Sequence, residues 1–164
     1  MAATRIDSNE LLMRSLHGAA LHKVLQPAEG VWEFDFETAG LTISCPWRLV
    51  SGGAVVLGSS DHGQRFGLPA PVDVRSETVR VLDGRKVEAI DINEQTGDLC
   101  IRFGSDARID AFNNSGGYEG WNYASQSGVM VVAMGGGELA IWSNLPKRGF
   151  ARGSDELNKR SHGN

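Results

Sequence analysis

The chain has 164 residues and a formal net charge of −4 at pH 7; 41% of its residues are hydrophobic and 22% are charged. These values are typical of one soluble globular domain and exclude a fibrous or wholly disordered protein. The acidic balance argues against a nucleic-acid partner, and the lack of an apolar stretch of about 20 residues argues against a membrane partner. We therefore expect a cytoplasmic protein.

The N-terminal region contains the only helix that the sequence predicts. Polar residues from Asp7 to Glu10 lead into an apolar series that ends at Leu16, as expected of a capped short helix over residues 7–17. Beyond it, 21 glycines against 5 prolines indicate many tight turns, and therefore many short strands.

The first group of strands follows the helix. Residues 32–37 alternate strictly between apolar and acidic side chains, which is the period of a strand with one buried face. Residues 38–40 form the turn into a second strand, 41–45, which ends at Pro46 because proline has no amide hydrogen to donate. A short strand over residues 54–57 comes next.

The second group begins after a surface excursion over residues 64–80, where Pro69 and Pro71 prevent regular pairing. Strands are predicted at 86–93 and 98–103 and then up to residue 112. A hairpin with its turn at 135–137 joins two further strands, 129–134 and 138–142. The sequence thus predicts about nine strands.

The apolar pattern of the first group returns in the second, over about residues 16–58 and 82–112. The matched pairs, 66 or 67 positions apart, are Leu16 with Leu82, Leu21 with Val87, Val24 with Ile90, Trp32 with Leu99, Phe34 with Ile101, Phe36 with Phe103, Leu41 with Ala107, Ile43 with Ile109 and Cys45 with Ala111.

We predict an all-β, mainly antiparallel fold in which this duplicated β-meander forms a sandwich or a barrel behind a short N-terminal helix. Residues 1–146 form the single domain. Residues 147–164 carry five basic and two acidic side chains, a balance of +3, and are predicted to be a mobile basic tail.

The first candidate binding segment is the glycine-rich loop that carries Tyr118, Glu119 and Trp121. Amphipathic aromatic side chains often anchor a ligand or a partner. In the alternative interpretation, the two aromatic side chains fold back and cover one end of the core. The first copy has Pro46-Trp47-Arg48 at the corresponding place.

The second candidate is Asp61-His62, because a carboxylate beside an imidazole is a combination used in acid–base catalysis. Successive residues of an extended chain point in opposite directions, and no nucleophile with a recognisable local signature accompanies the pair. A solvated loop is the alternative.

The third candidate is the carboxylate row Glu33, Asp35 and Glu37, which alternation places on the outer face of one strand. It is either a solvated face that protects a sheet edge or an acidic surface that meets a basic partner.

We predict neither a metal site nor a cofactor, because the four histidines show no ligand spacing and Cys45 and Cys100 stand alone. The two cysteines differ in the direction they face along their strands, so no disulfide is expected.

Four short segments carry a family resemblance: Cys45–Arg48, Leu82–Val87, Thr96–Leu99 and Gly117–Trp121. Together they resemble a family of small uncharacterised bacterial all-β proteins with a Tyr-Glu-Gly-Trp loop, some members of which are similar to immunity proteins of polymorphic toxin systems. The resemblance covers residues 16–142. It implies a bacterial cytosolic binding protein, and the family has no established active site to carry over to residues of this chain.

Three functional hypotheses follow. The first is a non-enzymatic protein-binding module, an immunity protein that blocks a basic toxin domain. The second is a small-molecule-binding or hydrolytic β-barrel with an end pocket lined by Trp47, His62, Tyr118, Glu119 and Trp121. The third is a homodimer joined through an exposed strand edge.

Overall fold

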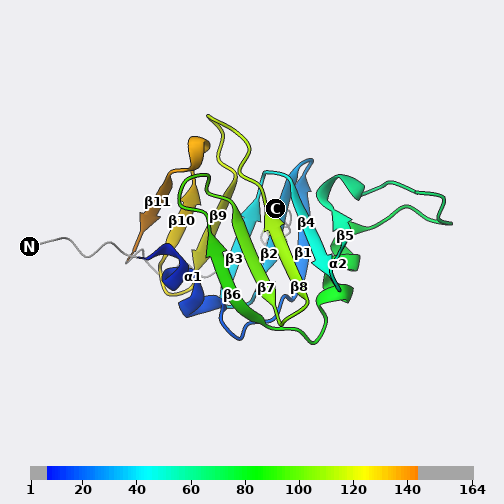
Figure 1. The fold of residues 1–164 in the computed structure, drawn as a ribbon, viewed down its shortest axis with the longest axis horizontal. Helices are drawn as coiled ribbons and strands as arrows, with labels where there is room; N and C mark the ends of the chain where they lie inside the picture. The colour runs from blue at the N-terminus through cyan, green and yellow to red at the C-terminus, as the bar shows by residue number, and fades with distance from the viewer. Residues whose placement is uncertain (1–6, 144–164) are drawn as a thin grey trace, which may run out of the picture.

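Two antiparallel β-sheets pack face to face in the computed structural model, which describes residues 7–143 (Figure 1). The elements are α1 (Ser8–Leu16), β1 (Lys23–Ala28), β2 (Val31–Asp35), β3 (Ala39–Ile43), β4 (Trp47–Ser51), β5 (Ala54–Gly58), the 3-10 turn η1 (Ser59–Asp61), α2 (Val74–Leu82), β6 (Val87–Ile92), β7 (Leu99–Phe103), β8 (Ala107–Ala111), β9 (Trp121–Ser125), β10 (Met130–Ala133), the 3-10 turn η2 (Gly135–Gly137) and β11 (Leu139–Trp142).

The first sheet has the strand order β1-β2-β3-β9-β10-β11, and the second has the order β5-β4-β8-β7-β6. Each sheet keeps two edge strands, so neither sheet closes on itself. The all-β prediction is confirmed, and of its two versions the sandwich is correct and the barrel is wrong. The described residues contain more strands than the sequence predicted.

Each half of the chain contributes its last strands to the other half's sheet. The halves run from α1 to β5 and from α2 to β11. Strand β3 of the first half pairs with β9 of the second, and β4 of the first pairs with β8 of the second. The sequence predicted two separate meanders; the structure instead interlocks them through exchanged hairpins.

The strand registers correct part of the repeat alignment. Phe34 lies opposite Leu41 between β2 and β3, and Ile101 lies opposite Ile109 between β7 and β8. Leu41 therefore corresponds to Ile109, an offset of 68, rather than to Ala107 at 66. The same registers place Trp47 opposite Ala111 and Trp121 opposite Ile43, which makes the two tryptophans structural counterparts.

Helix α2 occupies part of the segment that was predicted to be a surface excursion. The Asp73 side chain caps it by accepting a hydrogen bond from Arg75 N at 3.0 Å. Three valines within α2 weaken the helical pattern because β-branched residues are poor helix formers. Its bounds lie 66 positions after those of α1, so extending the repeat backwards from Leu16 and Leu82 would have found it.

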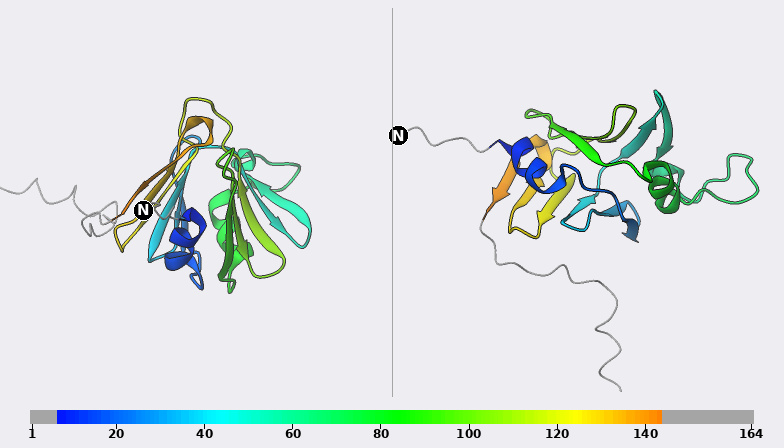
Figure 2. Two further views of the ribbon diagram at one scale, coloured as in Figure 1. Left: turned by 60° about the vertical axis from the view of Figure 1, so that its left-hand side comes forward. Right: turned by 90° about the horizontal axis from the view of Figure 1, so that it is seen from below.

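The two helices close the open sides between the sheets. Helix α1 packs against β6, whereas α2 packs against β1 and β5 (Figure 2). Gly18 N, just after α1, donates to Val87 O on β6, and Val87 N donates to Ala19 O, both at 2.8 Å. These bonds occupy part of the free edge of β6.

Aromatic side chains fill the space between the sheets. The Trp47 ring of β4 meets the rings of Trp32 and Phe34 on β2 edge-on, with centroids 5.4 and 5.0 Å apart. Phe36 and Phe103, which occupy equivalent places in the two halves, stack on each other at 6.3 Å. Equivalent residues of the two halves therefore contact each other in the core.

No helix within residues 7–143 is long and apolar enough to cross a membrane. The basic tail predicted over residues 147–164 lies outside the described residues.

The two equivalent tryptophans differ in one hydrogen bond, which predicts a difference in stability. Trp121 Nε1 donates to Gly97 O at 2.7 Å, whereas the buried Trp47 Nε1 has no partner among the described residues. Trp121→Phe should lower the free energy of unfolding by about 1–3 kcal/mol more than Trp47→Phe, since it leaves a buried carbonyl unpaired. Urea unfolding followed by circular dichroism measures both, and equal losses would contradict the assignment.

Candidate functional site

The most distinctive segment is the loop between β8 and β9, residues 112–120, where the repeat breaks. Its counterpart between β3 and β4 covers only residues 44–46. Gly120 O accepts from Ser44 N at 2.8 Å, and Pro46 O accepts from Phe112 N at 2.9 Å, so the two crossovers are tied together. The longer loop projects from one end of the sandwich (yellow-green in Figure 1).

Hydrogen bonds from Asn113 and Ser115 fix the course of this loop. Asn113 Nδ2 donates to Thr96 O and to Met134 O, both at 3.0 Å, and thereby links three loops. Ser115 Oγ accepts from Tyr118 N at 2.9 Å, and Ser115 O accepts from Gly136 N at 2.8 Å. The backbone that carries Tyr118 is therefore held in place.

The three loop residues that the sequence singled out have different positions. Tyr118 is 84% exposed and Glu119 is exposed, whereas Trp121 is 1% exposed in the core. Trp121 thus follows the alternative interpretation, and Tyr118 and Glu119 remain at the surface. Beside them is a depression of about 630 Å³ lined by Ser44, Cys45, Asn113–Ser115 and Gly117–Gly120.

The acidic row is shorter than predicted. Glu33 and Asp35 are exposed on the outer face of β2, but Glu37 lies in the turn beyond it with φ of 71°. Glu37 Oε2 is 3.2 Å from His22 Nε2. Since β2 lies between β1 and β3, these carboxylates do not protect a sheet edge.

The turn that carries Glu37 and the Tyr118 loop lie at opposite ends of the first sheet, whereas Glu33, which lies opposite Thr42, is near the loop end. Ala39, which follows the Glu37 turn, pairs with Ser125, whereas Ile43 pairs with Trp121 next to the loop. Four residues of strand separate the two levels, a distance of about 14 Å. The structure therefore separates Glu37 from the Tyr118 loop and spreads the three carboxylates along β2 and the turn after it.

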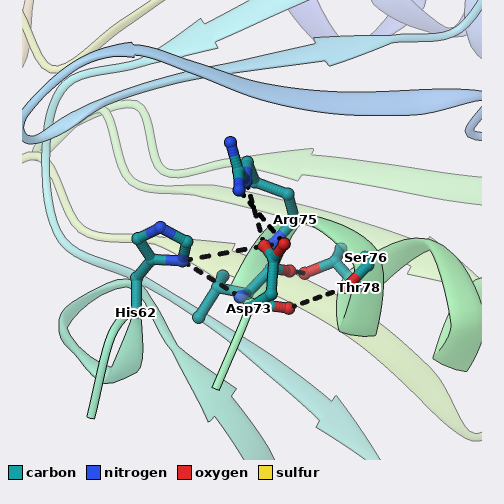
Figure 3. Close-up of polar contacts among 6 residues, drawn as sticks. His62, Asp73, Arg75, Ser76 and Thr78 are labelled. Atoms are coloured by element: carbon teal, nitrogen blue, oxygen red, sulfur yellow. Dashed lines mark hydrogen bonds and ion pairs between the residues drawn. The ribbon is translucent and has the colours of Figure 1, made fainter. Parts of the chain in front are cut away.

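Asp61 and His62 do not form a dyad with each other. Asp61 Oδ2 accepts from Gly58 N at 2.7 Å, and His62 Nδ1 accepts from Val74 N at 3.2 Å, at the start of α2 (Figure 3). The imidazole also meets the Trp32 ring edge-on at 5.5 Å. Both side chains therefore hold the segment between β5 and α2.

The carboxylate nearest His62 is that of Asp73, with Oδ1 at 3.8 Å from Nδ1. Arg75 donates to both oxygens of Asp73, from Nε at 3.0 Å and from Nη2 at 3.1 Å, and this ion pair lowers the pKa of Asp73. Asp73 also caps α2, so its role is to stabilise the start of this helix.

A charged network on the outer face of the second sheet was not found from the sequence. Asp110 on β8 accepts from Arg48 Nε at 2.9 Å and from Arg108 Nε at 3.1 Å. The Arg48 guanidinium also lies over the Phe112 ring at 5.2 Å. Arg108 and Asp110 alternate with the buried Ala107, Ile109 and Ala111, but no local pattern shows which charges meet across strands.

This network is specific to one sheet. It lines a shallow cavity of about 540 Å³. By the registers above, the positions equivalent to Arg48, Asp110 and Arg108 hold Asn122, Thr42 and Gly40 on the first sheet. The fold accepts small neutral residues at these places, so it does not require the charges.

Neither cysteine is disposed to act as a nucleophile. Burial, chiefly, raises the pKa of Cys45 to about 11; burial, followed by the charge of Asp110, raises that of Cys100 to about 11. Both thiols are free.

Among residues 7–143, no three His, Cys, Asp or Glu side chains are grouped so that they could hold a metal ion. The fold is an antiparallel β-sandwich in which each sheet contains strands from both halves of the chain. A family model described as a family of unknown function, DUF6188, matches residues 14–143, and the chain belongs to this family. No curated protein and no solved structure matches the chain significantly.

Two glycines of the loop offer a matched test of its packing. A Cβ on Gly120 would overlap the Asn113 side chain, whereas a Cβ on Gly117 would meet nothing within 4 Å. Gly120→Ala should therefore lower the free energy of unfolding by about 1–3 kcal/mol, and Gly117→Ala should change it by less than about 0.5 kcal/mol. Denaturant unfolding compares them, and a tolerated Gly120→Ala would refute this packing.

The raised thiol pKa values predict slow alkylation. At neutral pH, a shift from 9.0 to about 11 reduces the thiolate fraction about 100-fold. Iodoacetamide should therefore modify both cysteines much more slowly in the folded protein than in urea, and the folded-state rate should still rise above pH 9. Mass spectrometry of each site measures the rates; rapid modification of folded Cys100 would show that its thiol is activated.

Proposed function

We propose that this chain is a non-enzymatic protein-binding module that contacts its partner through the loop of residues 113–120, and that it acts as an immunity protein that blocks a bacterial toxin. The observation that carries the binding proposal is Tyr118, 84% exposed on a loop held by hydrogen bonds. The toxin role rests on the resemblance of the loop and strand motifs.

Preorganisation supports a recognition role for Tyr118. A large exposed aromatic side chain on a fixed backbone loses little conformational entropy on binding, so more of its contact energy contributes to affinity. The depression beside it could accept a partner side chain while the phenol ring covers the contact. The loop therefore places an exposed aromatic side chain next to a surface depression.

The groups that sequence reasoning considered for catalysis are engaged in the structure. His62 Nδ1 and the Asp61 carboxylate accept backbone hydrogen bonds, and both thiols stay protonated at neutral pH. These contacts favour binding over acid–base or nucleophilic chemistry as the function of the chain.

The alternative hypothesis, a pocket at the mouth of a β-barrel, required a closed barrel and tryptophan side chains that line the pocket. The sheets form a sandwich, and Trp47 and Trp121 are 2% and 1% exposed. Of the five residues assigned to that pocket, only Tyr118 and Glu119 line the depression at the loop end.

The test of this proposal uses the protein encoded beside this chain, because immunity proteins are encoded next to their toxins. Wild-type chain should bind that protein and protect cells that express it. Tyr118→Ala should weaken binding at least about tenfold, since it removes the central anchor. Calorimetry measures affinity, and growth measures protection.

Two controls locate the contact. Leu25→Ala, which truncates an exposed residue of β1, should bind as wild type. Reversing the charges of Glu33, Asp35 and Glu37 should slow association if a basic partner uses the acidic surface, and unchanged kinetics would exclude that surface. Wild-type affinity in Tyr118→Ala would exclude the loop, and a neighbouring protein that neither binds nor harms cells would refute the immunity role.

A further inference from the structure

An apolar surface unrelated to the Tyr118 loop lies on the side of β5. Four of the large hydrophobic side chains exposed within residues 7–143 gather in β5 and the segment after it: Val55 at 58%, Val56 at 43%, Phe66 at 68% and Leu68 at 53%. Isolated exposed apolar residues are common, but a group of four along one side marks an interaction surface.

Part of this surface is an arm, residues 63–71, in which every residue is exposed. Gly63 N donates to Val72 O and Val72 N donates to Gln64 O, both at 2.8 Å, so the arm is closed at its base. The arm extends beyond β5 and α2, away from the body of the sandwich (Figures 1 and 2). Phe66 stands near its tip with φ of 46°, a conformation that is uncommon for non-glycine residues.

The other part is the edge of β5 that carries no second strand, beside the contact between β5 and α2. Among the described residues, β4 is the only strand that pairs with β5, whereas β10, its counterpart in the second half, is covered by β11. The sequence Ala54–Gly58 has no charge and no proline, two protections of a sheet edge; its protection is limited to its short length and one bulge. A bulge leaves Val56 without a partner on β4, and both Val55 and Val56 are exposed.

The composition of the surface indicates which partner fits it. Strand β5 is uncharged, and Arg65 is the only charged residue of the arm, so two copies can meet across a two-fold axis with little repulsion. In a two-fold symmetric contact, the same surface of both copies lies in the interface, so one exposed apolar surface covers the other. A five-residue strand edge alone is far smaller than the about 1,200 Å² that stable interfaces bury, so the arm must contribute.

We infer that the β5 edge and the arm of residues 63–71 form a homodimer interface, in which the β5 strands of two copies lie antiparallel and each arm packs on the other copy. The second copy takes the place on β5 that β11 takes on β10. This interface is independent of the Tyr118 loop, which stays free in the dimer.

Analytical ultracentrifugation of the full chain over a wide concentration range tests the inference. Wild type should sediment as a dimer that dissociates on dilution. Val55→Lys should weaken the dimer at least about tenfold by placing two like charges across the axis, and Phe66→Ser should weaken it by a similar factor. Both residues are exposed, so the monomer fold should be unaffected, as circular dichroism would verify.

Matched variants separate this interface from general effects of charge. Val55→Thr keeps an uncharged β-branched side chain and should remain dimeric, and Leu25→Lys adds the same charge to the edge strand β1 and should also remain dimeric. A monomeric wild type at all concentrations would overturn the inference. So would a dimer that Val55→Lys and Phe66→Ser leave intact.

Discussion

The pairing of β3 with β9 and of β4 with β8 is the constraint on which the rest of the structure depends. Through these two contacts, each sheet is completed by strands from the other half of the chain. Neither half has a full apolar face without them, because an isolated three-stranded meander would leave one side of its core residues in water. The two crossovers, residues 44–46 and 112–120, must therefore meet at one end of the sandwich.

This constraint divides the chain into positions that are fixed and positions that are free to differ. Inward residues agree between the halves, as with Trp47 and Trp121 or Phe36 and Phe103, because both must fill the same space between sheets. Outward residues and loops differ between the halves. Asp110, which binds two arginines, has the neutral Thr42 at the equivalent position, and the long loop that carries Tyr118 has a short loop as its counterpart. Specific features of the protein lie where the halves disagree.

Local patterns in the sequence predicted much of the fold. The alternation of Trp32, Phe34 and Phe36 with acidic residues identified both faces of β2, since period two directly reflects the pleat. The same rule would have placed Trp121 inward with Tyr123, because the two share parity in β9. The exchange of hairpins was not predictable, because pairing partners far apart in the chain leave no local mark. The hydrogen bond of His62 was not predictable for a similar reason: its donor, Val74 N, belongs to α2, which the valine-rich sequence concealed.

The exchanged hairpins also have a consequence for the origin of the chain. Neither half has a place of its own for its last strands, β4 and β5 in the first and β9 to β11 in the second, since they add to the sheet of the other half. A protein made of one such unit would reach a complete core only as a pair of identical subunits that swap their hairpins. A chain that joins two such units, unlike a pair of identical subunits, allows each half to carry its own differences, as the crossovers at residues 44–46 and 112–120 do in length.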